Sequence, residues 1–292
     1  HQEDFGDIIF SMSYVLFDIG GTKTRVAVSE DLQSFSEPAK FATAPTMKAG
    51  VKDIVTAAGE LTDKPIRGIA GGIRGALNHD KTEMVHDAGG ALTGWEEQPL
   101  SKELKKALGG EVYLENDAAL VGMGETHFGA GENEQIVVYL TVSTGVGGAK
   151  IEHGAVDEYH YGFEPGHQIL DVDHTILGEG EEPTLENLVS GSALERRFGM
   201  KPYEIPQSDK VWDQLAYYLA HGLRNTILYW SPDVIVLGGS MIVGDPRILL
   251  NDIIRHTDAV LEGVVPLPSI VDATLGDVGG LYGAMALLQQ RV

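Results

Sequence analysis

The stretch DIGGTKTRVAV, from Asp18 to Val28, is the most informative part of the sequence. The apolar run Tyr14–Ile19 and the alternating segment Thr24–Ser29 predict two strands, and the paired Gly20 and Gly21 predict a hairpin turn between them. Because glycine has no Cβ, the main-chain amides of such a turn can approach a phosphate group closely. We interpret the turn as a candidate phosphate site, with an ordinary Gly-Gly hairpin as the alternative.

Polar side chains accompany this turn. Thr22 and Lys23 add a hydroxyl group and a positive charge. Asp18 ends a strand whose neighbours are apolar, and a carboxylate in such surroundings needs a partner. A magnesium ion, bound directly or through water, is one candidate partner, and a simple capping role for Asp18 is the alternative.

A second glycine turn occurs about midway along the chain. Strands are predicted at Gln135–Val142 and Ala149–Ile151, with STGVGGAK (Ser143–Lys150) joining them. Its G-x-G-G pattern leads into a strand instead of a helix, which argues against a dinucleotide-binding turn, and no Walker pattern is present. A third apolar run, Val234–Leu237, ends in Gly238–Ser240. This set fits the actin-like ATPase plan, in which two hairpins clamp the phosphates from opposite domains.

Strands alternate with helical patterns, which predicts an α/β protein. The repeated strand–turn–strand unit suggests two related α/β domains of the actin-like ATPase (ribonuclease H-like) class, with the active-site cleft between them. We expect domains at 12–126 and 127–279, with a closing helix at 280–292 that packs back on the first. Met12 is a candidate native start, which would make residues 1–11 an added leader. Helices are predicted at Lys48–Leu61, Leu100–Leu108, Ala118–Phe128, Lys210–Tyr229, Pro246–Leu261 and Gly280–Gln290.

Composition limits the functional classes. The formal net charge is −22, from 43 acidic and 21 basic residues, which disfavours nucleic-acid and anionic-membrane partners. A polyanion such as ATP must then be held by backbone amides, helix N-termini or a metal ion. No apolar run is long enough to predict a membrane span. The chain has no cysteine, which excludes disulfides and thiolate metal sites and fits a cytoplasmic setting.

A carboxylate follows a predicted strand in EVYLENDAALVGMGE, where Glu115, Asn116 and Asp117 precede a helix. The simplest interpretation makes Asn116 or Asp117 the helix N-cap. The functional one makes Asp117 the base that accepts a proton from a substrate hydroxyl attacking a γ-phosphate. An amide beside it suits a polyol, because Asn116 can both donate and accept hydrogen bonds.

Together these motifs resemble the ROK family (repressors, open reading frames and sugar kinases), which includes glucokinases. DIGGTKTRVAV and LTVSTGVGGAKI are similar to its two phosphate motifs, and LENDAALVGMGE to the segment with its catalytic aspartate. EPGHQIL (Glu164–Leu170) resembles the sugar-binding E-x-G-H motif, and LENLVSGSAL (Leu185–Leu194) the stretch with a further sugar-binding glutamate. DVIVLGGSM resembles the adenosine-side motif and GGLYGAMALL the closing helix. The matches keep the family's order from about Tyr14 to Leu288.

The resemblance implies ATP and Mg²⁺ as cofactors, a hexose as substrate and Asp117 as the base acting on its 6-hydroxyl. Asp18 would act near magnesium, through water. The residues implied to bind the sugar are Asn116, Asp117, Glu164, His167, Glu186 and Gly72. The residues implied to bind the nucleotide are Asp18, Gly20, Gly21, Thr22, Lys23, Thr144, Gly145, Gly147, Gly238 and Gly239.

The sequence departs from the family at one motif. Many members bind a structural zinc ion through the E-x-G-H histidine and three cysteines, whereas this chain reads DVDHTILGEGEEPTLEN and has no cysteine. We therefore expect no such zinc site. Four histidines recur at a spacing of seven, and a replacement metal site is a minor alternative; they are His153, His160, His167 and His174. The repressor branch carries an N-terminal helix-turn-helix, which this acidic chain gives no sign of.

The leading hypothesis is a glucokinase-type enzyme that phosphorylates a hexose and whose domains close on the sugar. Mannose, fructose and N-acetylhexosamines are alternative substrates, because they differ at only one or two hydroxyls. A non-catalytic sugar sensor on the same fold is the second hypothesis. A dinucleotide-dependent oxidoreductase is disfavoured by the glycine spacing. The resemblance also suggests a homodimer.

Overall fold

The structure is a computed structural model that describes residues 12–87, 90–159 and 162–292. The expected leader, residues 1–11, lies outside these ranges. The chain forms two compact units, the first containing residues up to Asp117 together with Ala284–Val292, and the second Ala118–Gly283. The expected division between residues 126 and 127 falls further along the chain, near the end of the helix that follows Asp117.

The first unit contains a five-stranded sheet in the order β3-β2-β1-β4-β7. β1 and β2 form an antiparallel hairpin, and β4 and β7 continue the sheet parallel to β1. The strands are β1 (Ser13–Ile19), β2 (Lys23–Ser29), β3 (Ala39–Ala42), β4 (Ile66–Ile73) and β7 (Glu111–Asn116). A small ribbon of β5 (Ala76–Leu77) and β6 (Met84–His86) precedes the short helix η1 (Thr93–Trp95).

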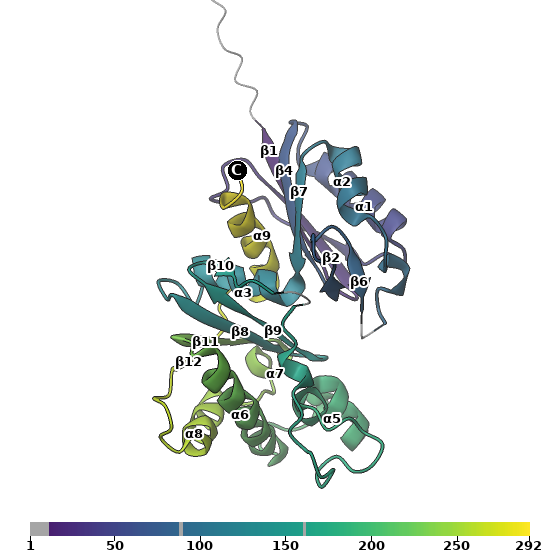
Figure 1. Cartoon of the computed structure of the whole chain (residues 1–292). Coiled ribbons are helices and arrows are strands. Elements are labelled where there is room, and N and C mark those ends of the chain that lie inside the picture. Colours follow the sequence, from purple (N-terminus) through teal and green to yellow (C-terminus); the bar gives the residue numbers. More distant parts are fainter. Residues whose placement is uncertain (1–11, 88–89, 160–161) are drawn as a thin grey trace, which may run out of the picture. The chain divides into compact units, whose positions relative to one another are not determined.

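Helices cover both faces of this sheet. α1 (Met47–Leu61) and α2 (Leu100–Leu108) lie on one face, and the last turns of α9 (Gly279–Gln289) lie on the other (Figure 1). Val15, Phe17 and Ile19 point into the same core as Ile54 of α1, while Leu16 is buried on the opposite face. This explains why β1 is apolar along nearly its whole length instead of alternating.

The second unit repeats the plan, with strand order β10-β9-β8-β11-β12. β8 and β9 form the antiparallel hairpin, and β11 and β12 follow parallel to β8. The same order of hairpin and parallel strands in both sheets confirms the expected α/β architecture of two related halves. The strands are β8 (Ile136–Val142), β9 (Val146–Glu152), β10 (Ala155–Val156), β11 (Val234–Gly238) and β12 (Ser269–Asp272).

The helices of the second unit also cover both faces of its sheet. α6 and α8 lie on one face and α3 on the other, where a Cβ on Gly122 would meet Tyr139 at 2.9 Å (Figure 1). The helices are α3 (Asp117–Phe128), α4 (Leu185–Val189), α5 (Gly191–Phe198), α6 (Val211–Trp230), α7 (Ser240–Val243) and α8 (Leu250–Leu261), with short turns η2 (Pro165–His167), η3 (Pro202–Glu204) and η4 (Gly276–Val278).

The predicted helices occur close to their expected bounds, with one shift. α8 begins at Leu250 instead of Pro246, because Leu249 has an extended and not a helical backbone, at φ −74° and ψ 130°. Within the ranges described, no helix is both long and apolar enough to cross a bilayer.

α3 is held firmly within the second unit. A Cβ on Gly283 would lie 1.7 Å from the Leu120 carbonyl oxygen, so α9 passes directly against the α3 backbone. The fully buried carboxylate of Glu125 accepts hydrogen bonds from the amides of Thr274 (2.9 Å), Leu275 (2.8 Å) and Ala130 (2.9 Å). These amides compensate a carboxylate that would otherwise be costly to bury. The helix that begins at Asp117 therefore has little freedom to move within this unit.

Candidate active site

The first glycine turn joins β1 to β2 and is anchored through its carbonyl groups. Thr43 Oγ1 donates to the Gly20 carbonyl at 2.7 Å, and the Thr43 amide donates to the Thr22 carbonyl at 3.1 Å. The Gly20 amide donates to the Lys23 carbonyl at 3.0 Å. Among the described residues, no acceptor is bonded to the amides of Gly21 and Thr22. The turn therefore presents unpaired backbone donors, which is the arrangement an anion requires.

Asp18 lies at the end of β1, directly before this turn. Its carboxylate is 3.4 Å from Nη1 of Arg25 on β2, and both side chains are largely buried. Mg²⁺ is commonly bound by one or two carboxylates together with substrate phosphates, and a carboxylate beside a phosphate turn fits that pattern. Lys23 is exposed at the start of β2.

The candidate residues of the first unit lie along one edge of its sheet. Asp18 pairs with Gly72 of β4, and Gly72 pairs with Glu115 of β7. Asn116 ends β7, and Asp117 begins α3. The carboxyl ends of parallel strands are the usual place for ligands in α/β sheets. The sheet register thus brings together three segments that are far apart in sequence.

Hydrogen bonds orient Asn116 at this edge. Its Nδ2 donates to the Gly75 carbonyl at 3.1 Å, and its amide donates to Glu115 Oε1 at 2.9 Å. Glu115 is buried and also accepts from Lys81 Nζ at 2.5 Å. No local sequence pattern predicts the Lys81–Glu115 pair, whose one signal is a glutamate at the end of an apolar strand.

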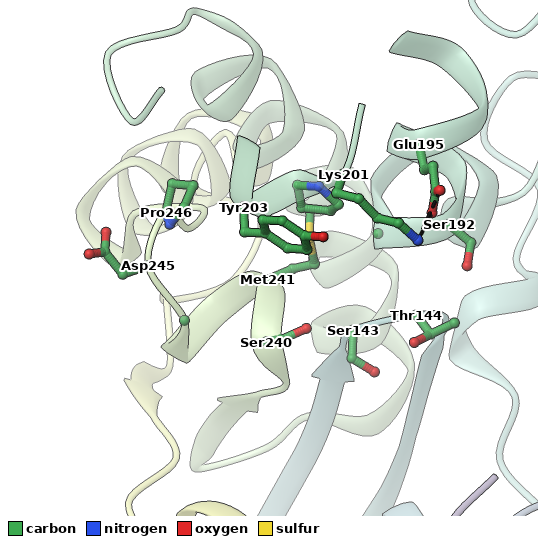
Figure 2. Close-up of a pocket in the computed structure, with 13 residues that line it drawn as sticks. Ser143, Thr144, Ser192, Glu195, Lys201, Tyr203, Ser240, Met241, Asp245 and Pro246 are labelled. Atoms are coloured by element: carbon green, nitrogen blue, oxygen red, sulfur yellow. Dashed lines mark hydrogen bonds and ion pairs between the residues drawn. The ribbon is translucent and has the colours of Figure 1, made fainter. Parts of the chain in front are cut away.

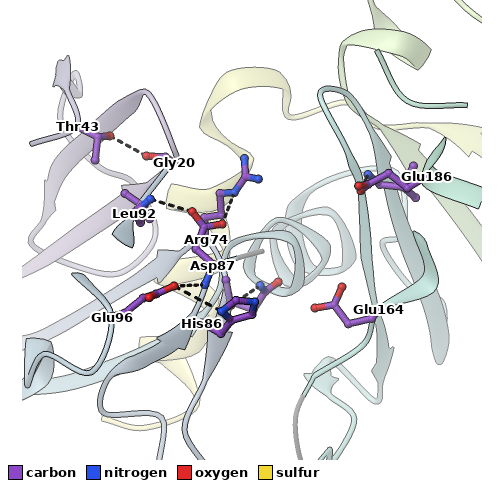
Figure 3. Close-up of polar contacts among 12 residues, drawn as sticks. Gly20, Thr43, Arg74, His86, Asp87, Leu92, Glu96, Glu164 and Glu186 are labelled. Carbon is purple, nitrogen blue, oxygen red and sulfur yellow. Dashed lines mark hydrogen bonds and ion pairs between the residues drawn. The ribbon is translucent and has the colours of Figure 1, made fainter. Parts of the chain in front are cut away.

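A second pair in this unit, Arg74 with Asp87, was also missed. Arg74 Nε donates to Asp87 Oδ1 at 3.0 Å, and Asp87 Oδ2 accepts from the Leu92 amide at 2.8 Å (Figure 3). Glu96 accepts from the Asp87 amide at 2.9 Å and lies 3.5 Å from His86 Nδ1 (Figure 3). The network fixes Asp87 and Leu92, and Ala91 lies beside the first glycine turn, where a Cβ on Gly21 would meet its Cβ at 3.1 Å.

The second glycine turn joins β8 to β9 and is also anchored through its carbonyls. The Gly191 amide donates to the Ser143 carbonyl at 2.7 Å, and the Ser192 amide donates to the Thr144 carbonyl at 3.3 Å. Both donors lie in the first turn of α5. Within the part of the chain that the structure describes, no acceptor is bonded to the amides of Thr144 and Gly145. The two turns therefore share one backbone arrangement.

A pocket of about 370 Å³ opens beside the second turn (Figure 2). Ser143 and Thr144 form one side, and Lys201 reaches across to Glu195 at 2.9 Å. The remaining lining residues are Gly191, Ser192, Pro202, Tyr203, Ser240, Met241, Gly244, Asp245 and Pro246. Its volume and mixed polar and apolar lining suit a ligand the size of a nucleoside.

Gly238 and Gly239 lie behind this pocket. A Cβ on Gly239, which has φ +87°, would come within 2.3 Å of the Val142 carbonyl oxygen. A Cβ on Gly238 would come within 2.4 Å of the Tyr139 hydroxyl. These glycines let β11 turn closely past β8 into α7, which brings Ser240 and Met241 to the pocket wall.

Three candidate sugar ligands of the second unit gather around Val146, the residue after the second turn. Glu186 Oε2, on α4, accepts from the Val146 amide at 2.8 Å. Gly166 packs so closely on the Val146 carbonyl that a Cβ there would lie at 2.4 Å. Glu164 and His167 flank Gly166, and their side chains are 58% and 47% exposed. Both side chains can therefore reach a ligand.

The glycines of the second turn are not equivalent. A Cβ on Gly145 would lie 2.6 Å from Glu186 Oε2, whereas one on Gly147 would meet Ala118 Cβ at an ordinary 3.4 Å. Glycine at position 145 therefore leaves space for the Glu186 carboxylate. At position 147, no contact within the protein requires glycine in place of alanine.

The segment DVDHTILGEGEEPTLEN, which was expected to lack a zinc site, is organised by a carboxylate. Asp171 is buried, and its oxygens accept from the amides of Thr175 (3.0 Å), Ile176 (3.1 Å) and Leu177 (2.8 Å). Burial alone would raise the pKa of Asp171, but these hydrogen bonds outweigh it and hold the pKa below its ordinary value.

The spaced histidines do not gather into a metal site within the described ranges, where no cluster of three ligating side chains occurs. His174 Nδ1 lies 3.3 Å from the Gly178 carbonyl. His160 falls outside the described residues.

Comparison with known proteins gives a consistent result. The model of the ROK family matches residues 14–291. A fructokinase from Lactococcus lactis subsp. cremoris is 28% identical over 96% of this chain and 100% of its own length.

Solved structures agree. A ROK hexokinase from Thermus thermophilus has a TM-score of 0.79 and 28% identity, covering 96% of this chain and 99% of that one. A ROK glucokinase from Streptomyces griseus, in complex with glucose and AMPPNP, has a TM-score of 0.76 and 24% identity, covering 95% and 99%. The latter likeness concerns the fold alone. These comparisons confirm the fold class expected from the two hairpins.

Proposed function

The chain belongs to the ROK family, and on that basis we propose that it is an ATP-dependent hexose kinase acting on the sugar 6-hydroxyl. The observation that carries the proposal is the pair of glycine turns, one in each unit, with anchored carbonyls and unpaired amides. A chain with net charge −22 needs such neutral donors to hold a polyphosphate.

In the proposed mechanism, Asp117 is the general base. The 6-hydroxyl gives its proton to the carboxylate as its oxygen bonds to the γ-phosphorus, and the bond to the β-phosphate oxygen breaks to release ADP. Its place directly after Asn116, whose amide is oriented by Gly75, supports a role at the sugar. Glu164, His167 and Glu186 would bind further hydroxyls.

The nucleotide would use both turns. Gly20, Gly21 and Thr22 would hold phosphate oxygens, as would Thr144 and Gly145, with the nucleoside in the pocket beside α5 and α7. Magnesium, when bound near Asp18, neutralises charge on the phosphates. The side chain of Lys23 adds a positive charge nearby.

For the sugar, glucose is the first candidate, from the glucokinase-like motifs. Fructose is the second, because a fructokinase is 28% identical over 96% of the chain. A non-catalytic sugar sensor is less well supported, since such a protein has no use for two phosphate turns. We further propose a homodimer, which light scattering after size-exclusion chromatography tests.

A coupled ADP-release assay tests the proposal, using MgATP with glucose, fructose, mannose, N-acetylglucosamine and N-acetylmannosamine. We expect saturable turnover with at least one of them. Calorimetry on the same panel separates the two hypotheses, because sugar binding without turnover on any member would replace the kinase with the sensor.

A further inference from the structure

Arg74 is a cation that the fold places against the first glycine turn, although it lies more than fifty residues away in sequence. Its amide donates to the Ile19 carbonyl at 3.1 Å, which fixes the residue beside the end of β1. A Cβ on Gly21 would lie 3.5 Å from Arg74 Nη1 and 3.7 Å from Cδ. The side chain therefore passes directly alongside the turn whose amides are unpaired.

Asp87 contacts this guanidinium through Nε. The Asp87 side chain is 2% exposed and its carboxylate accepts from Nε, whereas the Arg74 side chain as a whole is 35% exposed. Figure 3 shows the end of the guanidinium directed away from the carboxylate. Among the described residues, no acceptor is bonded to Nη1 or Nη2. Arginine presents donors in a planar fork, so these two remain available to an anion.

A purely structural role explains this arrangement less well. Burying a carboxylate with a cation generally gains little over an apolar pair of similar volume. The loop at Asp87 is also already tied by the Leu92 amide and by Glu96. A fixed guanidinium beside open amides is, in contrast, the usual way to bind a phosphoryl group.

We propose that Arg74 binds the phosphoryl group undergoing transfer and that Asp87 is the residue that positions its guanidinium. The proposal rests on the kinase function above. Arg74 follows Gly72, the expected sugar contact on β4, and lies against Gly21, the expected phosphate contact. A guanidinium between the sugar site and the phosphate site would contact the terminal phosphate of ATP. As the new oxygen–phosphorus bond forms and the bond to ADP breaks, Nη1 and Nη2 donate to the non-bridging oxygens, and the proton passes to Asp117.

The test compares Arg74→Met and Arg74→Lys with a control, Arg67→Met, because Arg67 is exposed at the start of β4 and Arg74 directly follows the end of that strand. Calorimetry measures the affinity of each protein for AMPPNP and for ADP, both with Mg²⁺, and the ADP-release assay measures kcat and KM. For Arg74→Met we expect AMPPNP affinity to fall roughly 10–100-fold, the usual size of a charged hydrogen bond, and ADP affinity less than about twofold. Arg74→Lys should lie between, since lysine keeps the charge without the fork.

Asp87→Asn is the second test. It keeps an acceptor for the Leu92 amide but weakens the pairing with Nε, so kcat should fall several-fold, with the KM for the sugar unchanged. Equal losses of AMPPNP and ADP affinity in Arg74→Met, or losses of Tm with normal kinetics in both variants, would show that the pair is only a clamp for the loop.

The two proposals fail in different ways. Wild-type protein that turns over a sugar, with Arg74→Met as active as Arg67→Met, overturns the role of Arg74 and leaves the kinase standing. If the wild-type protein binds AMPPNP but turns over no sugar, the kinase function is overturned. The role of Arg74 in binding the terminal phosphate is then tested only by whether Arg74→Met loses affinity for AMPPNP and not for ADP. Absence of binding to either nucleotide overturns both.

Discussion

The two glycine turns use one backbone device in two different settings. In each, the carbonyl groups are tied back and the central amides are left unpaired. The first turn is surrounded by charged pairs, Asp18 with Arg25 and Arg74 with Asp87. The second is flanked by Glu186 and a nucleoside-sized pocket. The duplicated fold thus supplies the same backbone turn twice, and the two turns differ in the side chains around them. We propose that both bind phosphate, the first beside the reacting groups and the second beside the nucleoside.

The turns also differ in what ties back their carbonyls. Thr43 serves the first through its hydroxyl and amide, whereas the first turn of α5 serves the second through two amides. A single side chain can be replaced without moving a helix, so the first turn is the easier one to weaken selectively.

The largest expected effect tests the proposed general base, Asp117, which belongs to the same unit as the first turn. Asp117→Asn keeps the shape but removes the base, so kcat should fall about 10²–10⁴-fold with little change in the KM for ATP. Asp53→Asn, on the exposed face of α1, is the matched control. Near-normal turnover would remove Asp117 from the mechanism.

The next effect tests the proposed role of the second turn in binding ATP and the sugar. Gly145→Ala places a Cβ 2.6 Å from Glu186 Oε2, so the carboxylate must move away and give up its bond to the Val146 amide, a loss of about 1–3 kcal/mol. We expect the KM values for both ATP and sugar to rise roughly 5–100-fold, because Glu186 must move. Gly147→Ala, with its Cβ at an ordinary 3.4 Å from Ala118, should stay within about threefold. Similar kinetics for the two variants would contradict the separate roles of these glycines.

A smaller effect concerns the anchor of the first turn. Thr43→Val removes the hydroxyl that donates to the Gly20 carbonyl, a bond worth about 1 kcal/mol. The KM for ATP should rise about fivefold while the KM for the sugar stays constant. Thr56→Val on α1, which loses a bond to the Lys52 carbonyl, serves as control. Equal changes in both KM values would indicate general damage instead of a loosened turn.

The smallest effect concerns the stability of the segment that contains Asp171, which follows the candidate ligand His167 in the second unit. Because the pKa of Asp171 is lower in the folded protein than in the unfolded chain, its charge stabilises the fold at pH values above the unfolded pKa of about 3.9. This stabilisation is lost as the pH falls through the pKa of the folded protein. Asp171→Asn should lower Tm by a constant amount from pH 8 to 5, with the gap to wild type narrowing below about pH 4. Asp173→Asn, exposed in the same loop, should show no such narrowing. A gap independent of pH would mean that the charge of Asp171 does not hold the loop.

The sequence predicted the parts of this protein that depend on neighbouring residues. Both hairpins follow from paired glycines between apolar runs, and the α3 helix follows from its local pattern. The ordered motifs also indicated the family, which the match over residues 14–291 confirmed. The start of α8 was placed too early, because an extended segment up to Leu249 carries residues that also suit a helix.

Tertiary structure decided the contacts between side chains and distant backbone. The register of β1, β4 and β7 aligned Asp18, Gly72 and Glu115, and only folding brought Glu186 to the Val146 amide. No periodic pattern in the sequence predicts the pairing of Arg74 with Asp87 or the amides that bind Asp171. Periodicity and turn chemistry act between near neighbours in sequence. An ion pair or a buried carboxylate depends on which surfaces pack together, and that is set by the whole sheet and its helices.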